Sequence, residues 1–493
     1  MIKRYADKDI EGLFSDENKV ALWQKVELAV MQARVSLGVM QKSDFDEISF
    51  VLSVNPTDIT WWKEREEETH HDLQAWIDER VRHLPVELRV HFHEGMTSFD
   101  TEEPAFALTL SRGTDFVVGA ISKLLEVIGA MAIKYRYTPM MGMTHGQAAE
   151  VQTFGKRCLT WYMDIHNDLA NLLKARDSLS YSKISGAIGN YGGVIPSVEK
   201  AALKILGLLP YHGATQIIPR EVYAPLAQAM CQLALTIDKI ATAIRLGART
   251  PRPIYQEPFG KKQTGSSRMP GKKNTISTEQ LEGMGRMALG YLNMVMLNIR
   301  TWEERAIEQS SVERVAWPDL FHVTMRSLSV IIKVLDGLQV YPDNMMRDII
   351  DTRGAWAAGP AKEFLREKLV GKGITTEDAY RMVQLAAFDV SMPKPRSAQL
   401  RAKPPSTFQE AKRAFLEIRD EGRSTTSIED VILSHQLETV EDLDISRETV
   451  AEWNRVLIEF FSDDKNISAW RNIFSLDDRL KDEEHLFKQI LFV

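Results

Sequence analysis

The sequence predicts an all-α protein built around an elongated helical bundle. Apolar residues recur with helical spacing in several long stretches, whereas the alternating runs that are typical of β-strands are almost absent. The clearest stretch spaces its apolar residues alternately by four and three positions, which is the pattern of packed helices. Its members are Leu226, Met230, Leu233, Ile237, Ile240 and Ile244.

Residues that are typical of helix ends indicate where the other long helices begin and end. The first begins near Ser15 or Asp16, either of which can cap it, and ends at Gly38, because glycine is common just past a helix C-terminus. The second ends before the Thr138-Pro139 pair, because proline disfavours helical backbone in the residue before it. Besides the seam helix, the expected later helices span about Phe106–Arg136, Thr153–Ser178, Glu279–Trp302 and Asp319–Leu338.

Two segments interrupt the helical pattern. "SGAIGNYGGVIPS" is rich in turn residues, and "SMPKPRSAQLRAKPPST", Ser391 to Thr407, combines proline breaks with basic residues. We expect the second to be an exposed linker that precedes a smaller helical C-terminal domain. The length of 493 residues also favours more than one domain.

Composition argues against several classes of partner. A formal net charge of −7 gives no general attraction for nucleic acid. The most apolar stretch, Val117 to Ile133, is interrupted by Lys123 and Glu126 and is expected to be an amphipathic helix, so no membrane partner is expected. With only Cys158 and Cys231 and no apolar leader in "MIKRYADKDI", the expected location is the reducing cytoplasm. No CxxC or HExxH spacing occurs, so neither a metal nor a cofactor is expected.

Four loops could carry chemistry, because they combine glycine with groups that bind anions or transfer protons. They are "THHDLQ", with His70, His71 and Asp72; "HFHEGMTSFD", with His91, His93, Thr97, Ser98 and Asp100; "TPMMGMTHGQAAE", with Thr144, His145 and Gln147; and "GSSRMPGKKN", Gly265 to Asn274. Taken singly, such residues are more often caps or turns. Four similar loops at the ends of long helices can instead converge on one pocket.

The last loop carries the most specific motif. "GSSRMPGKKN", followed by Glu279, resembles the GSSxMPxKxN…E signature of the fumarase/aspartase superfamily. Within that superfamily, "THHDLQAW", "TPMMGMTHGQAAEVQTFG" and "IRTWEERAIEQSSVERVAWPD" resemble the adenylosuccinate lyases, and the likeness covers roughly the first 350 residues. The resemblance implies helical domains at about 1–105, 106–350 and 351–493. It also implies a homotetramer in which each active site draws on three subunits.

The implied reaction is β-elimination of fumarate from adenylosuccinate, giving AMP, and from succinylaminoimidazole carboxamide ribotide, in purine biosynthesis. By resemblance, Ser266 is the general base, His145 the general acid, Lys272 a cation for the substrate carboxylates, and Glu279 a partner of the histidine. We expect the glycine-flanked Ser266 loop to close over the bound substrate. The residues implied in substrate binding are Arg4, Tyr5, His71, Asp72, His93, Thr97, Ser98, Thr144, Gln147, Gln216, Met269, Asn274, Arg305, Ser310 and Arg314; Arg4, Tyr5, Arg305, Ser310 and Arg314 are those expected at a 5′-phosphate.

Some residues depart from the family pattern and leave alternatives open. Phe99 stands where a small hydroxyl residue is usual, and Arg268 replaces a small or apolar residue. Thr275 replaces a common proline, and Glu303 and Gln309 stand where histidine is frequent. The alternatives are a related lyase or cycloisomerase acting on another succinylated amine or a tricarboxylate, and an inactive structural relative.

Overall fold

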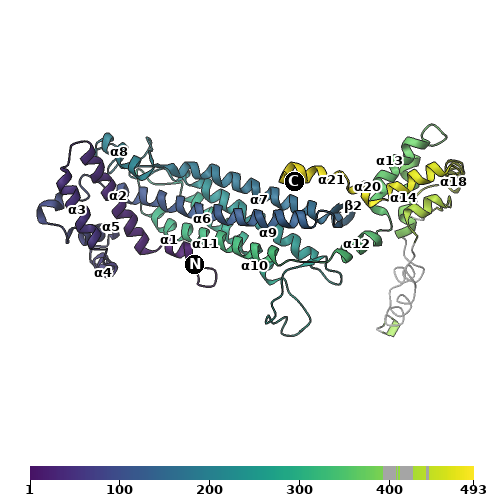
Figure 1. The fold of residues 1–493 in the computed structure, drawn as a ribbon, viewed down its shortest axis with the longest axis horizontal. Coiled ribbons are helices and arrows are strands. Elements are labelled where there is room, and N and C mark those ends of the chain that lie inside the picture. The colour runs from purple at the N-terminus through teal and green to yellow at the C-terminus, as the bar shows by residue number, and fades with distance from the viewer. Residues whose placement is uncertain (392–406, 408, 411–425, 440–442, 493) are drawn as a thin grey trace. The chain divides into compact units, whose positions relative to one another are not determined.

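A computed structural model describes residues 1–391, 407, 409–410, 426–439 and 443–492. It divides into two compact units, drawn in Figure 1. The first comprises Met1–Ile128, Trp161–Arg249 and Tyr255–Gln339, and the second Gly129–Thr160, Thr250–Ile254 and Val340–Val493. Except for its two end residues, the expected linker Ser391–Thr407 lies outside the described residues. The three-domain division remains a prediction.

The all-α fold class is confirmed. In the first unit the α-helices are α1 (Lys8–Leu13), α2 (Asp16–Ser36), α3 (Lys42–Val54), α4 (Ile59–Thr69), α5 (Asp72–Val81), α8 (Pro196–Leu206), α9 (Ala224–Gly247), α10 (Ile276–Leu297) and α11 (Glu308–Asp336). Short 3₁₀ turns are η1 (Val86–His91), η2 (Asp177–Ser180) and η3 (Arg220–Val222). Two further helices, α6 (Ser98–Lys134) and α7 (Phe154–Arg176), run from one unit into the other.

The predicted seam lies on α9. Each of its six apolar residues is at most 1% exposed, and α9 packs against both α10 and α11 (Figure 1). Burial of such side chains stabilises by about 1.5–3 kcal/mol each relative to exposure, so this pattern indicates the bundle core correctly. The first long helix is also confirmed as α2, with Ser15 as its N-cap, whose hydroxyl accepts from the Asn18 amide at 3.2 Å.

Two expected helix starts are wrong, because both helices continue through a proline. Helix α6 begins at Ser98 rather than Phe106 and contains Pro104, and α11 begins at Glu308 rather than Asp319 and contains Pro318. Proline removes one helical hydrogen bond. At α6 the Asp100 carboxylate accepts from the Thr97 amide at 2.9 Å, as in a capping box, and fixes the earlier start.

The second unit begins with a feature that the sequence did not predict. "TPMMGMTHGQAAE" is an antiparallel hairpin of β1 (Pro139–Thr144) and β2 (Gln147–Thr153), not a loop. The first unit contains the pair β3 (Tyr181–Ser182) with β4 (Leu209–Pro210), and its β5 (Tyr255–Gln256) pairs with β6 (Gln339–Val340) at the division between the units.

The remaining elements of the second unit are helical, as expected for the C-terminal region. They are α12 (Pro342–Asp351), η4 (Ala355–Ala357), α13 (Ala358–Leu369), α14 (Thr376–Ser391), α17 (Ile428–Leu433), α18 (Arg447–Phe460), α19 (Asp464–Ile473), α20 (Leu476–Leu480) and α21 (Glu483–Leu491). Their core includes Trp356, Leu365, Met382, Trp453 and Trp470. Glu483 of α21 accepts hydrogen bonds from the backbone and hydroxyl of Thr153, which ties this helix to the hairpin.

Among the described helices, α6 alone is long and apolar enough by composition to cross a membrane. Its apolar residues Val117, Ile121, Leu124 and Ile128 are fully buried within the protein. These four residues belong to the protein core, and 44% of the most apolar part of α6 is buried.

Candidate active site

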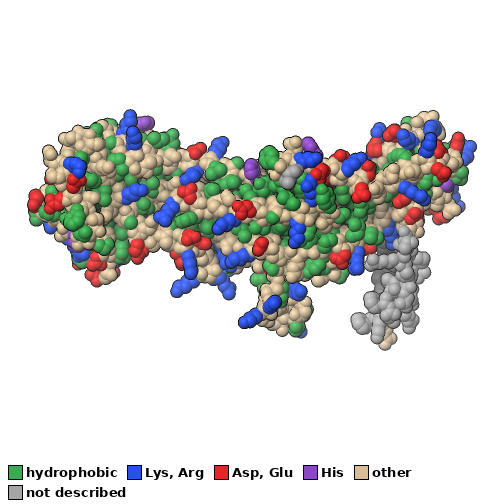
Figure 2. All heavy atoms as spheres, viewed as in Figure 1, with side chains coloured by type: hydrophobic (Ala, Val, Ile, Leu, Met, Phe, Trp, Pro, Cys, Tyr) green, Lys and Arg blue, Asp and Glu red, His purple; other side chains and the backbone are tan. Residues whose placement is uncertain are grey.

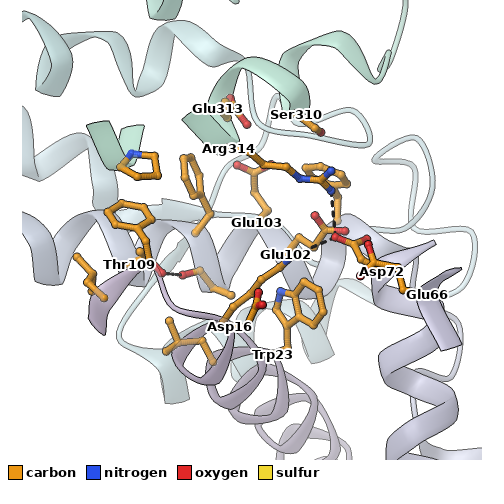
Figure 3. A pocket seen from close by; sticks show the side chains of 18 of the residues that line it. Asp16, Trp23, Glu66, Asp72, Glu102, Glu103, Thr109, Ser310, Glu313 and Arg314 are labelled. Atoms are coloured by element: carbon orange, nitrogen blue, oxygen red, sulfur yellow. Dashed lines mark hydrogen bonds and ion pairs between the residues drawn. The ribbon is translucent and has the colours of Figure 1, made fainter. Parts of the chain in front are cut away.

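A cavity of about 380 Å³ in the first unit lies where α1, α2, α6 and α11 meet (Figure 3). Its lining includes the aromatic side chains of Phe14 and Phe106. Asp72, Glu102 and Arg314 lie together at one end (Figure 3). The cavity therefore has a charged end that suits a polar ligand group.

Asp72 organises the charged end. Its Oδ2 accepts hydrogen bonds from Lys19 Nζ and Arg314 Nη2, each at 3.0 Å, and Figure 3 shows the Arg314 contact. Burial raises the pKa of Asp72, but Lys19 and Arg314 outweigh it, so the pKa lies below its ordinary value. Asp72 is therefore a carboxylate at neutral pH, and it holds two cations side by side.

His71 precedes Asp72 and caps α5. Its Nδ1 accepts from the Gln74 amide at 3.2 Å, so the proton of the neutral ring is on Nε2, which lies 3.2 Å from Ser98 Oγ. The helix-cap interpretation of this histidine is therefore correct. The cap also aims the ring at Ser98, another predicted site residue.

Arg305 supplies a third cation. Its guanidinium lies 4.2 Å from the centroid of the Phe99 ring, and its Nη1 donates to Gln216 Oε1 at 3.1 Å. Burial lowers the pKa of Arg305. Burial beside Asp72 raises the pKa of the nearby Glu102 carboxyl to about 7, although Lys19, Arg305 and Arg314 act in the opposite direction. This group titrates near neutrality.

The N-terminal segment contacts α11, the helix that carries Ser310 and Arg314. The amide of Asp7 donates to His322 Nδ1 at 3.0 Å, and the Tyr5 amide donates to the Ile2 carbonyl at 3.0 Å. Arg4 and Tyr5 therefore belong to an ordered turn and not to a disordered terminus.

Thr97 and Ser98 are fixed by the buried carboxylate of Asp100. Besides the Thr97 amide, Asp100 accepts from the backbone amides of Ser185 and Gly186 at 2.9 and 3.1 Å. It also forms an ion pair of 2.6 Å with the fully buried Lys183. Asp100 thus attaches the turn-rich segment after α7 to the start of α6.

The Ser266 loop is held by its own backbone. Ser266 Oγ accepts from the Met269 amide at 3.3 Å, and the Ser266 amide donates to the Lys272 carbonyl at 3.3 Å. Met269 and Lys272 are exposed, whereas Asn274 is half-buried. Glu279, at the start of α10, accepts from Arg245 Nη2 at 3.4 Å.

His145 lies in the second unit, at the exposed tip of the β1–β2 hairpin. The two turn residues, His145 and Gly146, have φ angles of 53° and 75°. Two consecutive positive φ values are characteristic of the type I′ turn, which matches the twist of the flanking strands. Thr144 and Gln147 are the strand residues that pair across this turn.

Comparison with known proteins identifies the family of this chain. Residues 2–290 match the family described as lyase. The adenylosuccinate lyases of Thermotoga maritima, Synechocystis sp. and Aquifex aeolicus are each 35% identical to this chain over 384, 387 and 387 residues. These matches cover 78% of the chain and 87%, 88% and 87% of the relatives. The chain belongs to the adenylosuccinate lyase family.

Solved structures show the same fold at lower identity. A fumarate lyase from Mesorhizobium sp. BNC1 matches with a TM-score of 0.71 at 19% identity, covering 95% of this chain and 98% of that one. A β-carboxy-cis,cis-muconate cycloisomerase from Acinetobacter calcoaceticus sp. ADP1 matches with a TM-score of 0.69 at 18% identity, with the same coverage. At these identities the likeness concerns the fold alone.

The structure brings together several residues that the resemblance to adenylosuccinate lyases indicated. His71 contacts Ser98, Asp72 contacts Arg314, and Gln216 contacts Arg305. Ser266 and Glu279 also lie in this first unit, whereas Thr144, His145 and Gln147 lie in the second. In the described part of the first unit Glu279 has Arg245 as its charged partner, and no histidine contacts it. The predicted catalytic roles of these residues stay predictions.

In this member of the adenylosuccinate lyase family, two residues that contact predicted site residues were not identified from the sequence. Lys19 holds Asp72, and Glu27 holds His93, with 2.7 Å between its Oε1 and Nδ1 of the ring. Lys19, Trp23 and Glu27 are spaced by four positions on α2, so they share one face of the helix. The sequence signal that could have identified Lys19 and Glu27 is their spacing of four residues on either side of Trp23. The apolar pattern of α2 alone does not single them out.

Proposed function

We propose that this protein eliminates fumarate from adenylosuccinate, giving AMP, and acts in the same way on succinylaminoimidazole carboxamide ribotide. The observation that carries the proposal is the cluster of Lys19, Arg305 and Arg314 around Asp72, beside the cavity. A nucleotide 5′-phosphate is a ligand that needs such a cluster, and arginine pairs with phosphate through parallel N–H donors. Ser310, on the first turn of the same helix as Arg314, adds a hydroxyl donor.

The substrate proton to be removed lies next to a carboxylate, and its loss places more negative charge on an existing anion. Preorganised donors and cations stabilise such charge most effectively. Lys272 and Asn274 supply an ammonium and an amide for this purpose in the proposed mechanism. The Met269 amide, which donates to Ser266 Oγ, supports an alkoxide on Ser266.

In the proposed elimination Ser266 takes the proton from the carbon, the electron pair forms the double bond of fumarate, and the carbon–nitrogen bond breaks. His145 returns a proton to the departing nitrogen. Imidazole suits this step because its ordinary pKa of about 6.5 lies near neutrality. The exposed turn that carries His145 leaves the ring accessible to a substrate.

The proposed assembly is a cytoplasmic homotetramer whose active sites combine residues of several subunits. Large apolar side chains remain exposed on the bundle helices, where Figure 2 shows hydrophobic surface. Leu235 and Leu246 of α9 are 41% and 53% exposed, and Leu289 and Leu297 of α10 are 45% and 78% exposed. Apolar surface of this kind is typical of subunit interfaces.

Ultraviolet absorbance with adenylosuccinate as substrate tests the proposed function. We expect the wild-type protein to release AMP and fumarate, and Ser266→Ala to lower kcat by about 10²- to 10⁴-fold, the usual contribution of a positioned proton transfer. Ser267→Ala, at the other serine of the motif, is measured in parallel, and a larger loss there than in Ser266→Ala contradicts the assignment of the base to Ser266. Absence of turnover by the wild type contradicts the function, and equal turnover by wild type and Ser266→Ala contradicts the assignment of the base.

A further inference from the structure

Glu27, a buried carboxylate on α2, contacts the predicted site residue His93 and the nearby Thr101. Glu27 is 1% exposed, and an isolated carboxylate in such a place is strongly unfavourable. Glu27 Oε1 contacts His93 Nδ1 at 2.7 Å and accepts from Thr101 Oγ1 at 2.7 Å, while Oε2 accepts from the His93 amide at 3.2 Å. Both carboxylate oxygens therefore contact His93.

This double contact fixes the backbone and the ring of His93 together. The residue has a φ of 56°, a left-handed conformation that is uncommon for a side chain other than glycine. The hydrogen bond from the His93 amide to Oε2 stabilises this backbone conformation. Because a carboxylate can only accept hydrogen bonds, the contact with Oε1 shows that Nδ1 of the ring carries a proton. Within the described residues, Nε2 of His93 has no hydrogen-bond partner, and the side chain is 16% exposed.

We infer that Glu27 is a positioning residue of the active site, which holds His93 by its Nδ1–H and presents Nε2–H as a positively charged donor to the anionic substrate. The identity of the substrate rests on the proposed function. The geometry of the Glu27–His93 pair is independent of the proposed function, because it follows from the contacts between the two residues.

The surrounding charges favour the protonated ring. Burial lowers the pKa of His93, but the Glu27 carboxylate on α2, with Asp100 and Glu102 on α6, outweighs it and raises the pKa above its ordinary value. Lys183 neutralises Asp100 through their 2.6 Å ion pair, so Glu27 is the closest uncompensated charge. His93 therefore stays protonated to a higher pH than a free histidine.

Chemical modification tests the pair without reference to the reaction. Diethyl pyrocarbonate attacks only the unprotonated imidazole, and peptide mass spectrometry gives the rate at His93, with His91 of the same peptide as internal reference. In Glu27→Gln we expect the pH of half-maximal modification at His93 to fall by about one unit or more, the usual effect of removing a close opposite charge. An unchanged midpoint overturns the inference.

Steady-state kinetics with adenylosuccinate test the link to the substrate. We expect Glu27→Gln to raise KM about tenfold at pH 8, with kcat within about twofold, and the deficit to narrow at pH 6, because a lower pH protonates a larger share of His93 in the variant. A purely structural defect lowers activity alike at both pH values, and that outcome overturns the inference. If the chain does not turn over adenylosuccinate at all, the modification experiment still decides the role of Glu27 toward His93.

Two further variants separate charge from packing. Thr101→Val removes the hydroxyl that donates to Glu27 and lies 3.5 Å from His93 Nδ1, but it keeps the carboxylate, so the modification midpoint of His93 should move less than in Glu27→Gln. Glu27→Asp keeps the charge on a shorter side chain and serves if Glu27→Gln does not fold; its midpoint should lie closer to that of the wild type than to that of an ordinary histidine. A midpoint in Glu27→Asp at the ordinary histidine value contradicts the electrostatic role.

Discussion

Phe99 and Arg305 form an unusual contact for a site that is proposed to bind an anion. The guanidinium lies over the aromatic ring, and its buried Nε has no hydrogen-bond partner among the described residues. An aromatic face stabilises a cation without neutralising it. Phe99, which departs from the family pattern, thus orients Arg305 while leaving its charge available to a phosphate.

Replacing Phe99 tests this contact. Phe99→Ser should raise KM for adenylosuccinate by about 2- to 30-fold, because cation–π contacts contribute about 0.5–2 kcal/mol. Phe99→Tyr keeps the aromatic face and should stay within about twofold of the wild type. Competition by AMP measures the same loss independently of turnover, and an unchanged inhibition constant in the serine variant contradicts the role of the ring.

The sequence could indicate only part of this charged end. The family motifs pointed to Asp72, Arg305 and Arg314, and the structure shows that all three participate in charged or cation–π contacts. Lys19 and Glu27 were not found in the same way, because their importance depends on contacts with residues that are distant in sequence, Asp72 and His93. The four-residue spacing around Trp23 marks their shared helix face but does not identify these partners.

At the scale of single elements, predictability followed the strength of the local pattern. The seam of α9 repeats over six apolar positions and was placed correctly. The hairpin β1–β2 was missed because "PMMGMT" has no alternation and its one β-branched residue is Thr144 at its end, so its strand form depends on pairing and burial. Pro104 and Pro318 hid the helix starts, because capping and packing outweigh one lost hydrogen bond.

The loop that carries Thr97 lies against the loop after α7, and glycine makes the approach possible. A Cβ at Gly95 would overlap the carbonyl oxygen of Gly193, whereas a Cβ at Gly38 would meet nothing within 4 Å. The two glycines have similar φ angles of 69° and 72°, so alanine at either carries the same backbone strain. The pair therefore isolates the effect of steric overlap.

Gly95→Ala should destabilise the fold by about 1–3 kcal/mol more than Gly38→Ala, the usual cost of overpacking. Denaturant unfolding of both variants measures the difference. The difference in stability should appear as a lower denaturant midpoint of unfolding for Gly95→Ala. This variant should also have lowered activity, because the predicted site residues Thr97 and Ser98 follow directly in the chain. Equal midpoints mean that the two loops separate without cost, which contradicts a rigid contact.

At the scale of the whole molecule, the proposed tetramer predicts that two inactive variants complement each other. Ser266→Ala and His145→Gln each lack one catalytic group, but a mixed assembly contains some sites with both groups intact. If the two residues come from different subunits, random mixing restores about a quarter of the wild-type activity. Co-refolding the two variants and measuring adenylosuccinate cleavage checks this, with each variant refolded alone as control.

If the mixture stays as inactive as its components although it has exchanged subunits, each site takes both residues from one chain. Sedimentation should first establish the tetramer for the wild type. A Leu289→Lys variant, which places charge on exposed apolar surface of α10, should sediment as smaller species. The fold could be predicted from periodicity, but assembly could not, because exposed leucines look the same in sequence as buried ones.

The turn at His145 limits how this region can change during evolution. Only His145 and Gly146 separate the paired residues Thr144 and Gln147, so the turn contains no spare residue. Side chains alternate between the two faces of a strand, so a one-residue change at the turn shifts the register of the pairs next to it. The hairpin already contains one register irregularity, between Met141 and Met143, so a further change of length at the turn would need a second one to keep the outer pairs in place.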